Sequence, residues 1–238
     1  MKSANWSSFS VLTLALALTP LPTLARSSGP VPAPRTLRAM YGLKPPSALK
    51  ADKSALVLVD FQDEFVHGHL PLADVRSAIE RATQLATWAR RSRILVVDVQ
   101  NVIPRAGSPL FSPTSPSSAF VPELAPEARD LVVVKATGGA FSKTNLDEEL
   151  RGRGIDTLIV AGLMTHLAVQ ITVSDGALLG YRVAVAADAT ATRALPSASG
   201  GNAVDALALQ RAALATMADR AADVLSTRTI LALPMAVL

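Results

Sequence analysis

Short apolar runs alternate along the chain with longer segments whose apolar residues recur every three or four positions. The runs are rich in Val, Ile, Leu and Ala, as in strands that are buried on both faces. We predict strands at residues 55–59, 94–99, 131–134, 157–161, 182–187 and 222–225, and helices at residues 74–93, from 145 to 152 or 154, 166–179 and 202–220. Because strands and helices alternate, right-handed crossovers should connect parallel strands. The pattern predicts an α/β fold: a three-layer, Rossmann-like parallel sheet of about six strands with helices on both faces.

Residues 1–25 have the pattern of a secretory signal peptide. Lys2 is the only charge before Arg26, residues 11–18 form an apolar core, and small residues occur up to Ala25. That core is shorter than the ~20 residues that span a bilayer, so we expect no permanent membrane span. We predict export, to the periplasm or the medium, after cleavage near Ala25. A disordered apolar tail is the alternative interpretation.

Proline divides the rest of the chain into regular and irregular parts. Residues 26–53 are rich in Pro, Ser and Gly and predict a linker or an arm on the surface, followed by one domain at residues 54–238. The connection at residues 101–130 is long and has no periodicity of its own. Connections of this kind are usually functional or mobile.

Charge and cysteine content exclude several functions. The formal net charge is +4, and the basic residues are scattered among acidic ones, so nucleic-acid binding is not expected. The chain has no cysteine, which removes disulfides, zinc–thiolate sites and thiol catalysis together.

Polar residues follow several predicted strands directly. In open parallel sheets, ligands bind beyond the carboxyl ends of the strands. Asp60, Gln100, Lys135 and the turn at residues 162–168 occupy those positions. We predict that Asp60 and Lys135 lie at neighbouring strand ends within hydrogen-bond reach, beside Ala168. Such a pair suits proton transfer, but an ion pair that only closes the sheet edge fits the spacing equally well.

Three segments resemble the isochorismatase-like hydrolases, also called the cysteine hydrolase superfamily. They are ALVLVDFQDEF (55–65), VVVKATGGAFSKTNLDEEL (132–150) and GLMTHLAVQITVSDGALLGYRVAVAADATATR (162–193). The resemblance extends from about residue 55 to residue 225. Most members use an Asp, a Lys and a Cys; the first two match Asp60 and Lys135, and Ala168 occupies the position of the Cys. The resemblance also allows a homo-oligomer.

The resemblance implies two kinds of function. One branch of the family hydrolyses a vinyl ether without the Cys; there Asp60 would be the general acid, Lys135 its electrostatic partner and Gln100 a substrate contact. However, Met164-Thr165-His166 resembles the amidase branch. A catalytically silent member that binds a small molecule or a protein is therefore the alternative. An artificial replacement of Cys by Ala fits less well, because the leader is retained.

The resemblance also places residues around the turn. Relatives have a cis peptide after the strand-end glycine, here between Leu163 and Met164, which aims N–H groups into an oxyanion hole. Leu163, Met164, Thr165 and His166 are thus candidate substrate-binding residues, with His166 expected to act through a hydrogen bond. Neither Thr165 nor Thr172 is expected to replace the thiol.

Other candidates are weaker. Phe65 and Phe141 line the pocket or pack in the core. His67 and His69 could line the mouth of the pocket, but we expect solvated loop residues, because a short-spaced pair is weak evidence for a metal site. Relatives that bind a metal use an Asp-x-His motif, whereas Asp98 is followed by Val and Gln. We therefore predict no metal and no cofactor, and a small molecule as the substrate or ligand.

Overall fold

The computed structural model describes residues 33–105 and 107–236. The predicted signal peptide lies outside the described residues. Residues from Arg35 onward form one compact unit. In the described ranges, no helix is long and apolar enough to cross a membrane.

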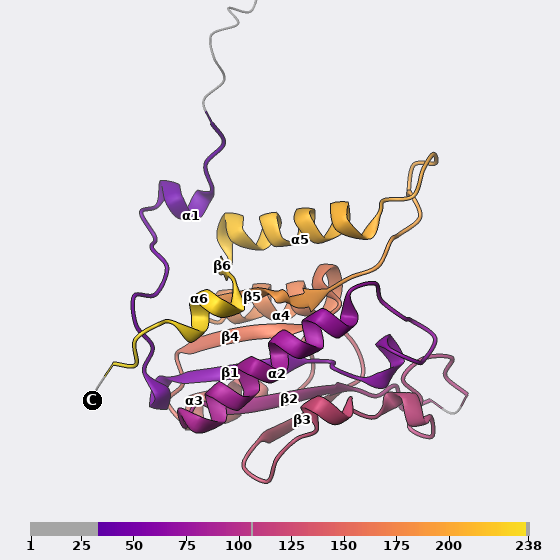
Figure 1. The fold of residues 1–238 in the computed structure, drawn as a ribbon, viewed down its shortest axis with the longest axis horizontal. Helices are drawn as coiled ribbons and strands as arrows, with labels where there is room; N and C mark the ends of the chain where they lie inside the picture. The colour runs from indigo at the N-terminus through magenta and orange to yellow at the C-terminus, as the bar shows by residue number, and fades with distance from the viewer. Residues whose placement is uncertain (1–32, 106, 237–238) are drawn as a thin grey trace, which may run out of the picture. The chain divides into compact units, whose positions relative to one another are not determined.

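The sheet has the predicted α/β architecture. Its strands, all paired in parallel, are β1 (Ser54–Val59), β2 (Leu95–Asn101), β3 (Leu131–Lys135), β4 (Thr157–Leu163), β5 (Arg182–Ala191) and β6 (Asp223–Leu225). Their order across the sheet is β3-β2-β1-β4-β5-β6, so the chain moves outward from β1 in both directions (Figure 1). The strand order reverses between β1 and β4. Open parallel sheets bind their ligands in the crevice beyond the carboxyl ends of the strands at such a point.

Helices cover both faces of the sheet, which confirms the three layers. The helices are α1 (Leu37–Met40), α2 (Val75–Arg91), α3 (Leu146–Gly152), α4 (Gln170–Leu178), α5 (Ala206–Arg220) and α6 (Thr227–Leu231). Side chains alternate along β1, so Leu56 and Leu58 join the core under α2 and α6. Ala55, Val57 and Val59 join the opposite core, to which α3, α4 and α5 contribute.

Several boundaries differ from the predicted ones for local reasons. Helix α5 begins at Ala206 instead of residue 202, because the Asp205 side chain caps it by accepting a hydrogen bond from Ala208 N at 2.8 Å. Strand β5 continues to Ala191, past the predicted residue 187. The short helices α1 and α6 were not predicted.

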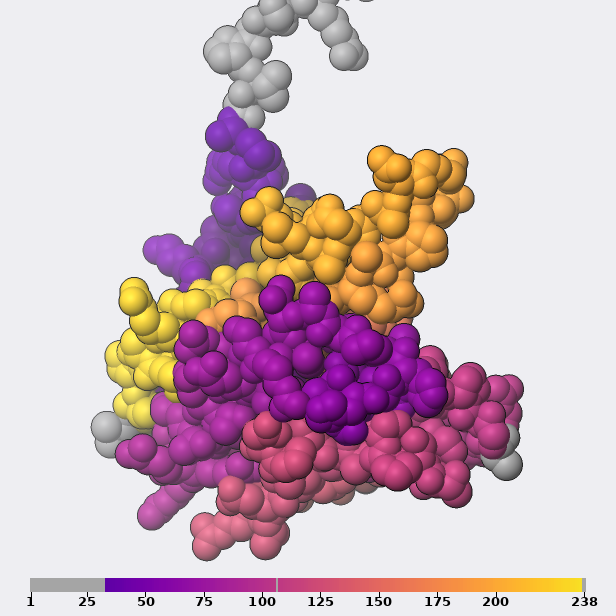
Figure 2. Space-filling view, turned by 45° about the vertical axis from the view of Figure 1, so that its right-hand side comes forward, coloured from indigo at the N-terminus to yellow at the C-terminus, as the bar shows by residue number. Residues whose placement is uncertain are grey.

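The segment between β5 and α5 projects from the carboxyl side of the sheet. Leu195 and Val204 form an isolated antiparallel bridge that closes it into a hairpin. Both views show this orange segment standing away from the neighbouring elements (Figures 1 and 2).

The described part of the predicted arm packs on the domain. Leu49 is 2% exposed, its N–H donates to Pro234 O at 2.9 Å, and Ala236 N donates to Leu49 O at 2.7 Å. The chain is therefore fixed to the domain before β1 begins.

Candidate active site

A buried ion pair lies at the carboxyl edge of the sheet. Asp60 follows β1 directly and Lys135 ends β3. Lys135 Nζ donates to Asp60 Oδ2 at 2.7 Å, and the two side chains are 1% and 3% exposed. The two residues are thus within hydrogen-bond reach.

The expectation that the two strand ends are neighbours was wrong. Strand β2 lies between β1 and β3, and its last residue, Asn101, pairs with Lys135. The Lys135 side chain therefore reaches past the end of β2 to Asp60. The backbone fixes the position of Asp60 beside the end of β2: the residue adopts a left-handed φ of 56°, and its N–H donates to Val99 O at 2.9 Å. Asp tolerates this conformation better than most residues do.

The environment of Asp60 sets its protonation. Burial raises the pKa of the Asp60 carboxyl to about 6, even though the charge and the hydrogen bond of Lys135 lower it. Oδ2 is held by Lys135, whereas Oδ1 is buried and has no hydrogen-bond partner among the described residues. A buried polar atom without a partner is costly. Oδ1 is therefore free to bond to a bound molecule or to carry a proton.

The turn after β4 lies beside this pair. Val59 pairs with Gly162, so Asp60 and Leu163 follow at the same level of the sheet. A Cβ at Gly162 would lie 2.5 Å from Val59 O, which excludes any side chain there. The predicted cis peptide is present between Leu163 and Met164.

Ala168 lies in a π-helical turn, Thr165–Val169, that precedes α4. Ala168 is 6% exposed and belongs to the same core cluster as Val59. Turns of this kind are rare and often mark functional sites. The position offers no reactive atom of its own.

Neither nearby threonine replaces a thiol. Thr172 Oγ1 donates to Ala168 O at 2.7 Å and accepts from Ala140 N at 2.8 Å, so it is fully engaged. Thr165 is completely buried, and its Oγ1 has no partner among the described residues. It has no base within hydrogen-bond reach to activate it.

His166 is tied to the end of β5. Its Nδ1 is hydrogen-bonded to Thr192 Oγ1. Burial lowers the pKa of His166, and the charge of Arg193 lowers it further. The imidazole is therefore neutral at physiological pH, and its hydrogen bond fixes the turn relative to β5.

Two glutamines fix the long connection above the site. Gln100 Nε2 donates to Ser118 O at 2.8 Å, and Gln62 Nε2 donates to the same oxygen at 2.7 Å. Gln62 Oε1 also accepts from Asn101 N at 2.8 Å. Gln100 thus positions the connection, and Gln62, which the sequence analysis did not single out, has the same role. The sequence signal for Gln62 was its place two residues after a strand-end Asp.

Glu64 makes a further anchor for this connection. Its side chain is 1% exposed, accepts from Ser117 Oγ at 2.6 Å and accepts from His69 N at 2.7 Å. Burial by itself would raise the pKa of Glu64, but these hydrogen bonds lower it. The His67 and His69 side chains are 67% and 71% exposed and bond to Asp63 and Glu64, as expected of loop residues.

Of the two aromatic candidates, Phe65 is a core residue and Phe141 is partly buried against the core. Phe65 is 2% exposed, and its ring centroid lies 5.5 Å from that of Phe111. The Phe141 ring stacks on Tyr181 at 5.9 Å, next to the amino end of β5. Both rings therefore pack against other aromatic rings of the domain.

Arg193 is a basic residue at this edge that sequence reasoning missed. It follows the carboxyl end of β5, and its charge acts on His166. Its Nε is buried and has no hydrogen-bond partner in the described part of the chain. Arg193 was missed because the sequence predicted a strand that ends at residue 187, whereas β5 continues to Ala191.

Asp98 lies apart from the site, under α2. It is 1% exposed; burial and the nearby Asp130 raise its pKa to about 7, while Arg90 lowers it. In the described ranges, no cluster of three or more His, Asp or Glu side chains is arranged to hold a metal ion.

Comparison with known proteins identifies the family. A model of the isochorismatase domain matches residues 54–229. The chain belongs to the isochorismatase family. A secreted isochorismatase effector of Verticillium dahliae is 33% identical over 195 residues, which cover 82% of this chain and 98% of that protein.

Other relatives of this chain include a hydrolase and a solved structure with the same fold. A streptothricin hydrolase of Streptomyces noursei is 31% identical over 178 residues, 74% of this chain and 68% of that protein. The crystal structure of an isochorismatase from Pseudomonas putida matches with a TM-score of 0.76 and 31% identity, over 83% of this chain and 99% of that one. Family membership and these relatives support a hydrolase that acts on small molecules.

Proposed function

We propose that this protein is an exported hydrolase that cleaves a carboxylated vinyl ether of the isochorismate type without a thiol nucleophile. One observation carries the proposal. A buried carboxyl with one unpartnered oxygen and a raised pKa stands at the carboxyl edge of the sheet, where the resemblance aligns Ala168 with the usual nucleophile. Such a site suits proton donation better than nucleophilic attack.

The reaction can be written with Asp60 as the only proton-transfer group. Protonated Oδ1 donates its proton to the terminal vinyl carbon, and an oxocarbenium ion forms at the ether carbon. Water adds there, and its extra proton returns to the Asp60 carboxylate. The resulting hemiketal breaks its C–O bond, with proton transfer to the departing alkoxide oxygen, and yields an alcohol and a 2-oxo acid. The net change is the addition of one water.

The neighbouring residues have supporting roles in this proposal. Lys135 fixes Oδ2 and so directs Oδ1 toward the substrate, while its charge limits how far burial raises the pKa. Gln62 and Gln100 hold the long connection over the site. Arg193, with its unpartnered Nε at the same edge, would bind the substrate carboxylate. The secreted relative and the signal peptide predicted at residues 1–25 support export.

The proposal is tested by measuring the release of pyruvate from isochorismate in an assay coupled to the oxidation of NADH. The purified protein should turn over isochorismate faster than ureidoacrylate, the substrate of an amidase relative, at equal concentration. Faster hydrolysis of ureidoacrylate would contradict the vinyl-ether assignment. Binding of isochorismate without turnover of either substrate would favour the catalytically silent alternative.

The rate should depend on pH through Asp60. Only the protonated carboxyl can donate, and its pKa is raised to about 6. We therefore expect kcat/KM for isochorismate to fall about tenfold per pH unit above that value, because kcat/KM reports the ionisation of the free enzyme. Measurement from pH 5 to pH 9 at constant ionic strength checks this. A rate that rises with pH would instead indicate a base.

Introduction of a thiol distinguishes the two branches of the family. In Ala168→Cys the new group would be the only thiol in the chain and would lie before α4, beside Asp60. If the frame were that of an amidase, the thiol should react with iodoacetamide faster than the thiol of Ala128→Cys, an exposed control, and amidase turnover should appear.

For a thiol-free hydrolase we expect a different result from the same variant. Vinyl-ether turnover should change less than about tenfold, because the proton donor is intact. Strong loss of that turnover together with gain of amidase activity would contradict the proposal.

A further inference from the structure

A cavity lies at the amino ends of the strands, at the end of the sheet opposite Asp60 and Lys135. Thr157, the first residue of β4, and Arg182, the first residue of β5, line it. The length of β4 separates the cavity from the carboxyl edge by about 20 Å, at ~3.3 Å per residue. Its volume of about 560 Å³ lies within the range of small-molecule sites. Nothing in the proposed reaction uses it.

Basic side chains dominate the lining. The charged lining residues are Arg38, Lys44, Lys50, Arg182 and Arg220, against one acidic residue, Asp223. Asp223 is already engaged, because Arg38 Nη2 lies 2.7 Å from its Oδ2 and both side chains are less than one-fifth exposed.

The remaining basic residues are poorly compensated. Arg182 pairs with Asp156 at 3.0 Å, and both of these side chains are mostly exposed. Within the described ranges, Lys44, Lys50 and Arg220 take part in no ion pair. The cavity therefore carries uncompensated positive charge, which attracts anions.

Apart from Ser47 and Thr157, the uncharged side chains of the lining are mainly apolar. They include Leu43, Pro45, Pro46, Leu49, Val183 and Ala184. The Tyr181 residue, 6% exposed, also contributes. A bare inorganic ion would leave this apolar surface in contact with water, whereas a ligand with an apolar body would cover it.

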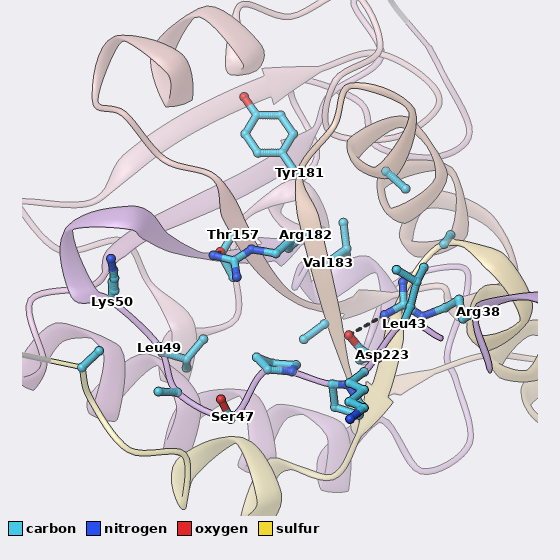
Figure 3. A pocket seen from close by; sticks show the side chains of 18 of the residues that line it. Arg38, Leu43, Ser47, Leu49, Lys50, Thr157, Tyr181, Arg182, Val183 and Asp223 are labelled. Atoms are coloured by element: carbon cyan, nitrogen blue, oxygen red, sulfur yellow. Dashed lines mark hydrogen bonds and ion pairs between the residues drawn. The ribbon is translucent and has the colours of Figure 1, made fainter. Parts of the chain in front are cut away.

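The wall formed by the arm is held in place before any ligand binds. Two backbone hydrogen bonds tie Leu49 to Pro234 and Ala236, and Leu37 N donates to Asp219 Oδ1 at 2.8 Å. In Figure 3, Lys50 stands on one side of the cavity and the Arg38–Asp223 pair on the other, with Arg182 between them in the view. A preformed site of this kind loses little entropy when it binds.

We propose that this cavity binds a small organic anion, a molecule with a cyclic or aromatic body and at least one carboxylate or similarly acidic group. The uncompensated cations favour a negatively charged ligand, and the apolar wall favours a ligand with an apolar ring system. The inference is independent of the chemistry proposed for Asp60.

Binding of 8-anilino-1-naphthalenesulfonate to the full chain tests the proposal, because this probe is a fluorescent aromatic anion. We expect one saturable class of sites whose affinity falls as NaCl is raised from 50 to 500 mM, since salt screens the charges. The uncharged analogue N-phenyl-1-naphthylamine should bind at least about tenfold more weakly, a difference of about 1.4 kcal/mol.

Charge reversal locates the bound probe. Lys50→Glu combined with Arg220→Glu should weaken probe binding at least about tenfold, again about 1.4 kcal/mol. The matched control is Arg129→Glu combined with Arg211→Glu, which makes the same change in net charge at two exposed positions outside the cavity. The control should bind the probe as the unaltered chain does. Circular dichroism should show that both double variants are folded.

Two results would overturn the inference: no saturable binding, or equal weakening in both double variants. Turnover of isochorismate is not a readout here. Failure of the proposed reaction would therefore leave this test unaffected.

Discussion

Asp60→Asn is expected to lower kcat for the vinyl ether by at least ~2–3 orders of magnitude, the usual contribution of general acid catalysis. Asn has nearly the same shape, tolerates the left-handed backbone at this position and can still accept the hydrogen bond from Lys135 Nζ. It cannot deliver a proton to carbon at a comparable rate. Initial rates at saturating substrate, measured by release of the 2-oxo acid, check the prediction.

A matched substitution controls for the loss of a carboxylate elsewhere. Asp52 is exposed and precedes β1 at the amino end of the sheet, so Asp52→Asn should leave kcat unchanged. Retention of more than about one-tenth of the activity by Asp60→Asn, in protein whose thermal unfolding is unaltered, would remove Asp60 from the role of proton donor.

Lys135→Met is expected to change both the pH profile and the stability. Lys135 lowers the pKa of Asp60 through its charge and its hydrogen bond, so its loss lets burial raise that pKa above about 6. The falling limb of kcat/KM should therefore move to higher pH. The value of kcat should fall at least about tenfold, because Oδ1 is no longer directed at the substrate.

The stability effect has a definite sign. A carboxyl whose pKa is raised on folding contributes stability at low pH and loses it as the pH rises through the folded-state pKa. In the unaltered chain this loss spans pH 3.8 to about 6; in Lys135→Met it continues above that range. The variant should therefore lose up to ~3 kcal/mol at pH 8 and less at pH 5, since breaking a buried pair is costly only while the partner is charged.

Urea unfolding at both pH values measures this difference. The double variant Asp60→Asn with Lys135→Met should recover much of the stability at pH 8, because neither group then leaves a buried charge. A pH limb that stays in place in Lys135→Met would show that Lys135 does not control the ionisation of Asp60.

The sequence by itself determined the layers of this protein and the members of its site edge. Apolar runs such as residues 55–59 and 157–161 can be satisfied only by strands buried on both faces, and amphipathic segments between them must cover those faces. Residues that follow such strands must lie at one edge of the sheet, so the sequence places Asp60, Lys135 and the turn after Gly162 at the same edge. These are local properties, fixed by period and by the direction of the strands.

Only the tertiary structure decided how those residues meet. The chain order does not give the strand order, so the insertion of β2 between β1 and β3, and the reach of Lys135 across its end, could not be read from spacing. The hydrogen bond from Gln100 to Ser118 and the stacking of Phe141 on Tyr181 depend on contacts between segments distant in the chain. So does the cavity between the arm and the starts of β4 and β5. The physical reason is the same in each case: period fixes which face a side chain occupies, whereas its partner depends on packing among elements that the local pattern does not encode.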